Sequence, residues 1–509
     1  MPVYQPGCES QVQREWRRIS DLLEIWQSSP EKAQQVEAEI HGLRDIRGIV
    51  RKACARLALE EHELFDLKQW LQQVDRLSQS LVRFPPVLPR GMSLYCCSLL
   101  LDALSLEGDS GFYLADCYDP KLGRLRRLQR QKFSALSEAK EQKQAVITQE
   151  TGLEFNYQGC LRVGKHQPEL LEQLNNRNDL MEVAETYMEV EFSLRKTAEM
   201  LELAREIADL EQEVQQQEYI IRQMLTEEVA RYSRWLLSSC NRIGAIDLLF
   251  AKGRLAREMG GCVPVLTTEN RLQLSGLLHP LVERQLSEQG LVFQPLEVDI
   301  AGGKITLITG ANMGGKSVAL RAVGLAVAMA QLGLLVSARR MEFSLRNFVY
   351  YSQQEESPQQ GLSTFGAEVY SLARVLPRHH QPGLYLLDEP ARGTNPHEGA
   401  GLVAGIINWL ASGNSLALIA THFPGLTVDS SVEHLQVAGL SNVDSDELNQ
   451  ALAGGRKSLQ QLMDYTLVPS RGDVPRDALK VAAFLGLSQE IIDYAHHKMG
   501  LLAKEVVDK

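Results

Sequence analysis

The chain contains 509 residues, of which 44% are hydrophobic, so it has room for about three or four domains and ample material for their cores. Its formal net charge of −11 argues against a uniformly basic nucleic-acid-binding surface but leaves room for a local basic groove. It has no apolar run as long as a membrane span, no signal peptide at its start and no cysteine pairs with zinc-site spacing, so we expect a cytoplasmic protein with reduced cysteines and no membrane partner.

The first half of the chain has the hydrophobic periodicity of helices. Residues 1–83 show it at Trp16, Ile19 and Leu23, and three prolines within residues 85–89 then interrupt it. Residues 84–265 form a second region, which we expect to be all-α. Its basic stretch, residues 124–132, fits a solvated helix face better than a nucleic-acid contact.

The most regular segment lies between Pro168 and Pro264, where no proline occurs. Apolar residues there occupy the first and fourth positions of a heptad, and one polar residue, Gln217, interrupts the series (Met200, Leu203, Ile207, Leu210, Val214, Ile221 and Met224). This pattern predicts a long helix packed along a seam, either a lever or part of a short antiparallel coiled coil. A helix of about 40 residues would span about 60 Å, a length suited to carrying motion.

Residues 266–465 have a different character. Short apolar runs such as Leu384–Leu387 and Leu416–Ala420 alternate with helical stretches, which predicts an α/β domain with a parallel sheet covered on both faces. Residues 466–509 add a helical tail, with helices predicted at Pro475–Ala483 and Ser488–Met499. The expected fold is therefore multidomain: an all-α region with long helices, an α/β P-loop NTPase domain and a C-terminal helical tail.

A P-loop motif follows a strand predicted at residues 304–309 and precedes a helix. Its glycines let backbone N–H groups surround phosphate oxygens at the positive end of that helix. We expect Lys316 to reach the β- and γ-phosphates of ATP and Ser317 to ligate Mg²⁺. A glycine-rich turn without a ligand is disfavoured by the flanking strand and helix. The predicted ATP-binding residues are Gly310, Ala311, Asn312, Met313, Gly314, Gly315, Lys316 and Ser317.

Two further strands end in residues suited to phosphate chemistry. Asp388 and Glu389 directly follow the apolar run that begins at Leu384. We expect Asp388 to hold Mg²⁺ and Glu389 to orient or deprotonate the attacking water. His422 follows the run Leu416–Ala420, so it could sense the γ-phosphate by hydrogen bonding, which favours a functional role over a structural one.

Five motifs occur in a fixed order: the P-loop, Ser-Thr-Phe-Gly-Ala-Glu at 363–368, Leu-Leu-Asp-Glu at 386–389, Arg-Gly-Thr at 392–394 and Ala-Thr-His at 420–422. This set resembles the MutS family of ATPases. The sequence Gly-Thr-Asn-Pro-His-Glu-Gly-Ala at 393–400 resembles that of the bacterial branch linked to recombination control. The resemblance covers most of the chain, and it is strong in residues 300–425 and weak before residue 90.

The resemblance implies a homodimer, or a dimer with a related MutS-like subunit, that forms two composite ATP sites. Ser363 would then act in trans on the partner's nucleotide. Phe293 would lie against adenine, although a core role is equally open, and the C-terminal helices would form a dimerising helix-turn-helix. Because the chain has no match to the mismatch-reading domain, the resemblance implies a reduced member of the family, and the segment around Arg162 to Leu171 is too short for a full DNA clamp.

These observations predict an ATP hydrolase that uses ATP and Mg²⁺ to move lever helices. On the family resemblance, it would act on duplex or branched DNA as a mismatch-repair or recombination-type clamp. The alternative is an ATP-dependent protein remodeller, such as a reactivating factor whose client is a cobalamin-dependent aminomutase, which suits the acidic balance. A structural dimer with a dead nucleotide site is disfavoured because Lys316, Asp388 and Glu389 are all present.

Overall fold

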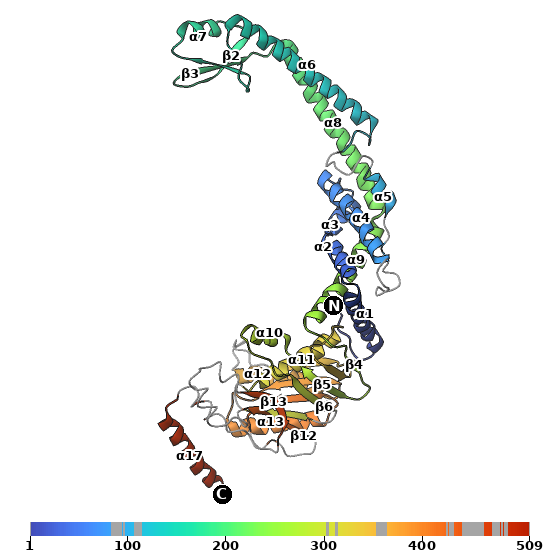
Figure 1. Ribbon diagram of the computed structural model, residues 1–509, viewed down its shortest axis with the longest axis vertical. Coiled ribbons are helices and arrows are strands. Elements are labelled where there is room, and N and C mark those ends of the chain that lie inside the picture. The colour runs from blue at the N-terminus through green and yellow to red at the C-terminus, as the bar shows by residue number, and fades with distance from the viewer. Residues whose placement is uncertain are drawn as a thin grey trace. The chain divides into compact units, whose positions relative to one another are not determined.

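The chain forms two compact units in the computed structural model (Figure 1). The helical unit contains residues 34–85 and 89–245, and the α/β unit contains residues 1–33, 86–88 and 246–509. The residues that the structure describes are 2–82, 94, 97–105, 114–301, 305–310, 314–352, 364–423, 426, 432–439, 463–470, 479, 482 and 487–507.

The two units divide the chain differently from the four segments expected above. Residues 1–33 belong to the α/β unit, so the expected segment 1–83 is shared between units, and the four-segment division stays a prediction about domains. Among the described residues, no helix is both long and apolar enough to cross a membrane.

Helices dominate the helical unit, and two of them, α6 and α8, form a long antiparallel pair (Figure 1). The direction follows from their cross-links, since Arg126 of α6 binds Glu218 of α8 while Lys132, further along α6, binds Glu206. The helices that contribute to this unit are α2 (Pro30–His41), α3 (Arg47–Cys54), α4 (Glu61–Val82), α5 (Ser98–Ala103), α6 (Pro120–Thr151), α7 (Pro168–Asn175), α8 (Ala198–Arg231) and α9 (Ser233–Glu258), which contributes to both units.

The buried stripe of α8 follows the predicted heptad only as far as Ile221. Beyond it the stripe moves to Leu225 and Val229, and Met224 is 50% exposed. A strict heptad averages 3.5 residues per turn, so its stripe drifts around a straight helix with 3.6 residues per turn, and the added four-residue steps compensate for that drift. Gln217, the polar interruption, is buried because its amide donates to Asp119 Oδ2 at 2.6 Å, at the start of α6.

The expectation that residues 84–265 are all-α is wrong at the far end of this pair. There β1 (Cys160–Gly164), β3 (Glu189–Leu194) and β2 (Leu180–Glu185) form an antiparallel sheet in that order. Leu161, Val163 and Phe192 pack with Ile147 of α6 in one core cluster. Their alternation with exposed residues is the strand pattern, and it places one face of the sheet inward.

The α/β unit contains two sheets. The larger has the strand order β13-β12-β7-β11-β10-β9 and is parallel apart from β13. Its strands are β7 (Ile305–Thr309), β9 (Phe348–Ser352), β10 (Gly383–Asp388), β11 (Leu416–Ala420), β12 (Val432–Gly439) and β13 (Asp464–Pro469). The smaller sheet has the order β4-β8-β5-β6, with β4 (Val265–Leu266), β8 (Arg340–Phe343), β5 (Arg271–Leu277) and β6 (Leu296–Ala301).

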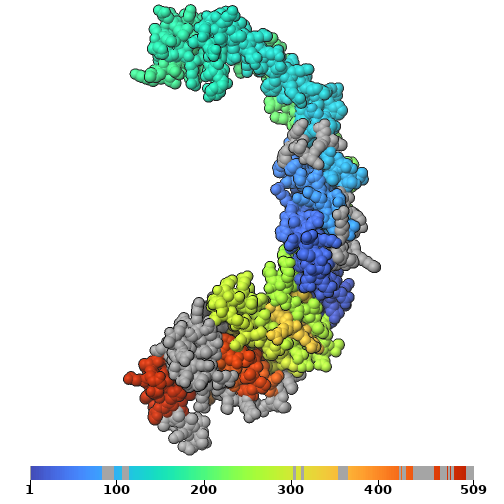
Figure 2. All heavy atoms as spheres, in the orientation of Figure 1, coloured from blue at the N-terminus to red at the C-terminus, as the bar shows by residue number. Residues whose placement is uncertain are grey.

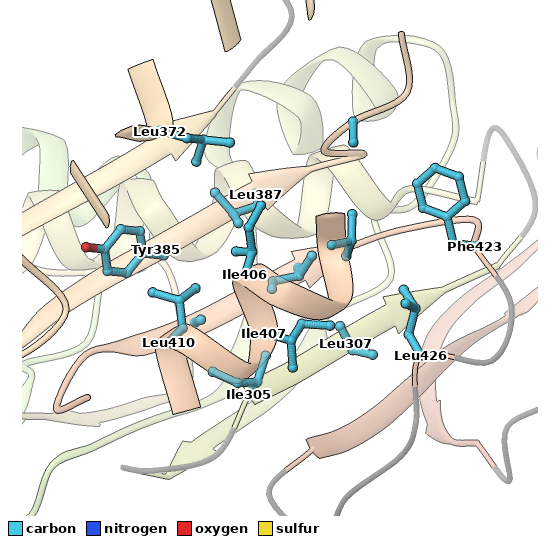
Figure 3. Close-up of a cluster of buried hydrophobic side chains, with 14 residues drawn as sticks. Ile305, Leu307, Leu372, Tyr385, Leu387, Ile406, Ile407, Leu410, Phe423 and Leu426 are labelled. Carbon is cyan, nitrogen blue, oxygen red and sulfur yellow. The ribbon is translucent and has the colours of Figure 1, made fainter. Parts of the chain in front are cut away.

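Helices cover both faces of the parallel part of the larger sheet, as the fully apolar strands predict. Tyr385 and Leu387 of β10 pack with Leu410 of α13 in the cluster of Figure 3. Leu386, between them, points to α11, where Gly324 leaves room for its side chain. The helices of this unit include α1 (Glu9–Ser28), α10 (Pro280–Glu288), α11 (Lys316–Gln331), α12 (Thr364–Val375), α13 (Pro396–Ala411) and α17 (Gln489–Val507).

The predicted tail helix at Ser488–Met499 corresponds to α17, which continues to Val507. The other predicted tail helix, Pro475–Ala483, lies almost entirely outside the described residues.

Candidate functional site

The P-loop joins β7 to α11 through a turn that requires glycine at two described positions. Gly310 has φ 147°, and a Cβ there would lie 2.9 Å from Val437 Cβ. Gly315 has φ 79° in the left-handed region, directly before α11 begins at Lys316. Glycine adopts these backbone conformations without the steric cost that a side chain brings. Ala311, Asn312 and Met313 lie outside the described residues.

Lys316 is a buried cation in the first turn of α11. Only 5% of its surface is exposed, and its Nζ donates to the carbonyl of Gly310 at 2.9 Å and lies 3.7 Å from Glu389 Oε1. Burial lowers the pKa of Lys316, while the nearby carboxylates of Glu389 and Asp388 favour its charged form. A buried ammonium beside a helix N-terminus is an arrangement that attracts phosphate oxygens.

Asp388 is the last residue of β10, and its two carboxylate oxygens differ in their surroundings. Its Oδ2 accepts a hydrogen bond from the Tyr351 hydroxyl at 3.3 Å, whereas its buried Oδ1 has no hydrogen-bond partner within the described parts of the chain. An unpaired buried carboxylate oxygen is costly unless a cation satisfies it. Asp388 and the Ser317 hydroxyl are both oxygen donors, the type that Mg²⁺ prefers, so the residues present fit that ion.

Glu389 is held in a strained turn after β10. Its φ is 50°, its N–H donates to the carbonyl of Ala420 at 2.9 Å, and its Oε2 accepts from Arg392 Nη1 at 2.9 Å. Ala391 also has a positive φ, of 64°. Such backbone strain in non-glycine residues concentrates at functional sites.

The Ser-Thr-Phe-Gly-Ala-Glu motif packs against this turn within the same chain. The backbone N–H of Ala391 donates to both carboxylate oxygens of Glu368 on α12, each at 3.4 Å. Burial raises the pKa of Glu368. Phe365 Cβ lies 3.2 Å from the position that a Cβ on Gly393 would take. Ser363 lies outside the described residues, so its action in trans stays a prediction.

His422 follows β11, the strand between β7 and β10. Its side chain is exposed, with its ring centroid 4.5 Å from that of Phe423. The preceding Thr421 is buried and anchors the turn, since its N–H donates to the carbonyl of Ile308 and its Oγ1 accepts from the N–H of Phe423. Strand order thus places His422 at the edge where the P-loop and the carboxylates also lie.

A pocket of about 600 Å³ adjoins the P-loop. Phe293, which is 9% exposed, lines it together with Gly314 and Gly315, and so does Tyr465, whose Cδ1 lies 3.1 Å from the position of a Cβ on Gly315. Its remaining lining is largely aliphatic (Val282, Leu286, Leu291, Val292, Leu296, Val318, Ala319, Val437, Met463 and Leu467). An apolar pocket with aromatic walls suits a flat ring such as a nucleotide base.

Comparison with known proteins supports the resemblance. Residues 306–503 match the family of MutS domain V. A Staphylococcus epidermidis protein named endonuclease MutS2 is 32% identical over 284 residues, which cover 55% of this chain and 34% of that protein. A DNA mismatch repair protein MutS from Caldicellulosiruptor saccharolyticus is 23% identical over 514 residues, which cover 97% of this chain and 56% of that protein.

The comparisons therefore make residues 306–503 similar to MutS domain V and most of the chain similar, at low identity, to MutS proteins. The chain spans only about a third to a little over half of the length of the curated relatives it matches; a Thermomicrobium roseum endonuclease MutS2, 32% identical over 317 residues, is covered over 37% of its length.

The structure places Lys316 and Glu389 in direct contact, with Asp388 close enough to act on the charge of Lys316. Sequence reasoning missed three residues here. Tyr351 bonds to Asp388, Arg321 bonds to Tyr351, and Tyr465 lines the pocket beside Phe293. Their roles depend on which strands are neighbours, so no local motif marks them.

Proposed function

We propose that this MutS-like chain binds ATP together with Mg²⁺ and hydrolyses it. The observation that carries the proposal is the cluster of Lys316, Glu389 and Asp388 around a glycine turn, with Asp388 Oδ1 lacking a hydrogen-bond partner among the described residues. Mg²⁺, held by Asp388 and Ser317, would neutralise charge on the phosphate oxygens. Lys316 would exchange its bond to the Gly310 carbonyl for one to the β- and γ-phosphates, and the base would enter the pocket lined by Phe293 and Tyr465.

Glu389 is the group that we assign to the attacking water. Its Oε2 is held by Arg392, which leaves Oε1 on the side of Lys316. A carboxylate fixed in this way can orient water without searching among side-chain rotamers, a contribution typical of general-base groups.

The larger activity that we propose is a dimer that uses ATP to move the α6–α8 pair against a DNA target. Two facts support this proposal: the printed names of the relatives, a DNA mismatch repair protein and an endonuclease, and the length of α8, 34 residues. ATP binding and target binding would be reciprocally coupled, so the target must change nucleotide affinity when it binds.

The test compares Glu389→Gln with Glu433→Gln, which makes the same change at an exposed position of β12. Glu389→Gln is expected to bind a fluorescent ATP analogue with the affinity of the wild type and to lose turnover by about 10²-fold. Glu433→Gln should keep the wild-type rate. Normal turnover in Glu389→Gln would remove this residue from the mechanism, and a wild type that binds no nucleotide would defeat the proposal.

One observation favours a protein as the target instead. The distal module, residues 152–196, is drawn as spheres in Figure 2. It contains eight Asp or Glu residues and five Lys or Arg residues. Three of the five cations, Arg162, Lys165 and Arg177, already pair with carboxylates of the module. Tyr187 and Met188 in its hairpin turn are 94% and 71% exposed. Acidic charge repels the phosphate backbone, whereas exposed aromatic and methionine side chains are common in protein interfaces.

Charge reversal in this module distinguishes the two targets. The double variant Glu182→Lys with Glu189→Lys changes two exposed carboxylates. If the module contacts DNA, the variant should bind duplex DNA more tightly and with a steeper dependence on salt. If the target is a protein, duplex binding should be the same as in the wild type.

A further inference from the structure

The hydroxyl of Tyr351 lies between a cation and the carboxylate that we assign to Mg²⁺. Arg321 Nε lies 3.1 Å from the Tyr351 hydroxyl oxygen, and that oxygen lies 3.3 Å from Asp388 Oδ2. We propose that Arg321 and Tyr351 are positioning residues that hold Asp388 in the orientation required for Mg²⁺, an inference that rests on the proposed ATPase function.

The direction of the hydrogen bonds follows from the chemistry of the three groups. A guanidinium only donates, so the Tyr351 oxygen must accept from Arg321. The hydroxyl proton is then directed to Asp388, whose ionised carboxylate only accepts. This arrangement engages Oδ2 and leaves Oδ1, which is buried and has no partner within the described residues, as the oxygen available to a cation.

The same chain of contacts connects the two elements that carry the assigned Mg²⁺ ligands. Arg321 lies four residues after Ser317 on α11, so both side chains project from one face of that helix. Tyr351 is on β9, which is the parallel neighbour of β10, and it pairs in register with Leu386, two residues before Asp388. Arg321 and Tyr351 therefore fix α11 and the end of β10 relative to each other at the point where both ligands leave the backbone.

Groups that orient a metal ligand typically contribute about 10–100-fold to metal affinity or activity. Tyr351→Phe removes one oxygen and keeps the ring, so its main effect should be on Asp388. We expect the Mg²⁺ concentration for half-maximal binding of a fluorescent ATP analogue to rise about 10-fold, while the affinity for that analogue in EDTA stays unchanged.

The matched control is Tyr350→Phe on the same strand. Tyr350 faces the other side of the sheet, where its hydroxyl lies 2.9 Å from Ser371 Oγ, so this variant also loses one bonded hydroxyl. It should keep the wild-type Mg²⁺ dependence.

Arg321 is exposed, so Arg321→Met is a second variant that should fold normally. It is expected to shift the Mg²⁺ dependence in the same direction as Tyr351→Phe, and Arg321→Lys should recover part of that shift.

Three outcomes would overturn the inference. The first is that Tyr351→Phe and Arg321→Met both keep the Mg²⁺ dependence of the wild type. The second is that Tyr350→Phe shifts the Mg²⁺ dependence as much as Tyr351→Phe does, which would indicate a general packing effect. The third is a wild type that binds no nucleotide, or binds it equally well with and without Mg²⁺. That result would refute the proposed ATPase function itself, and it is distinguishable from the other two because it is seen in the wild type.

Discussion

Helix α9 passes α1 with no space for a side chain at Gly253. A Cβ on this residue would lie 2.5 Å from Trp26 Cζ3 and 2.9 Å from Leu22 Cδ2. The indole of Trp26 cannot easily move away, because the Phe250 ring packs edge-on at 5.7 Å and the Arg257 guanidinium lies over it at 4.9 Å. Gly253→Ala therefore tests how tightly α9 is seated within the α/β unit.

Two opposing terms set the size of the effect. Alanine in a helix interior is favoured over glycine by about 1 kcal/mol. Forcing a methyl group into a packed contact costs about 1–3 kcal/mol. The same exchange at Gly405 in α13 of the same unit meets nothing within 4 Å among the described residues, so only the helix term applies there. Comparing the two variants cancels that term and predicts that Gly253→Ala is less stable than Gly405→Ala by about 1–3 kcal/mol.

Urea unfolding of both variants, followed by circular dichroism, measures this difference through their midpoints. Hydrogen exchange of the α1 and α9 amides then locates the loss, which should be concentrated in these two helices for Gly253→Ala. Equal midpoints and equal protection in the two variants would refute the reasoning, because they would mean that α1 moves aside at no cost.

Three further experiments test single residues of the chain. Lys316→Ala and Ser363→Ala should each be inactive, and a mixture should recover up to about half the activity per mixed dimer; a mixture as inactive as its parents would place Ser363 in cis. Burial lowers the pKa of His434, whose Nε2 lies 2.7 Å from Thr309 Oγ1. The free energy of unfolding should therefore be highest above about pH 6.5 and should fall as the pH drops below that value. Urea midpoints at pH 7.5 and 5.5 should show this fall, and it should be smaller in His434→Gln. Burial raises the pKa of Cys240 to about 11, so iodoacetamide at pH 8 should alkylate exposed Cys54 first, as judged by mass spectrometry.

The residues that we assign to the nucleotide could be proposed from the sequence because their positions follow from local order. Asp388, Gly310 and His422 each lie within two residues of the end of an apolar run, and the carboxyl ends of parallel strands meet at one edge of a sheet. Tyr351 could not be predicted in this way. Tyr350 and Tyr351 look alike in the sequence, and only the pairing of β9 with β10 decides which of the two hydroxyls faces Asp388.

The sheet of the distal module was missed for a related reason. A window without proline suggests an unbroken helix, and the alternation of Val190 with Phe192 is too short to stand out within it. The alternation of Leu161 with Val163 lies just before that window and is equally short. The strands are stable because α6 supplies Ile147 to their inner face, a contact between segments more than ten residues apart. Long-range packing of this kind leaves little trace in local periodicity.

The basic stretch of α6 shows how contacts outweigh composition. Arg124, Arg127 and Arg130 are exposed, as the expected solvated face requires. The Arg126 side chain is only 15% exposed, and it donates at 2.7 Å to Asp116, to Glu218 and to the carbonyl of Leu114. With Lys132 bound to Glu206, these two cations serve to hold α6 on α8. A shift of α8 by one turn, about 5.4 Å, would break the Arg126–Glu218 and Gln217–Asp119 contacts together. Because such partly buried charged contacts are costly to leave unpaired, a displacement applied to one helix should carry the other with it, and the pair would transmit motion as one body.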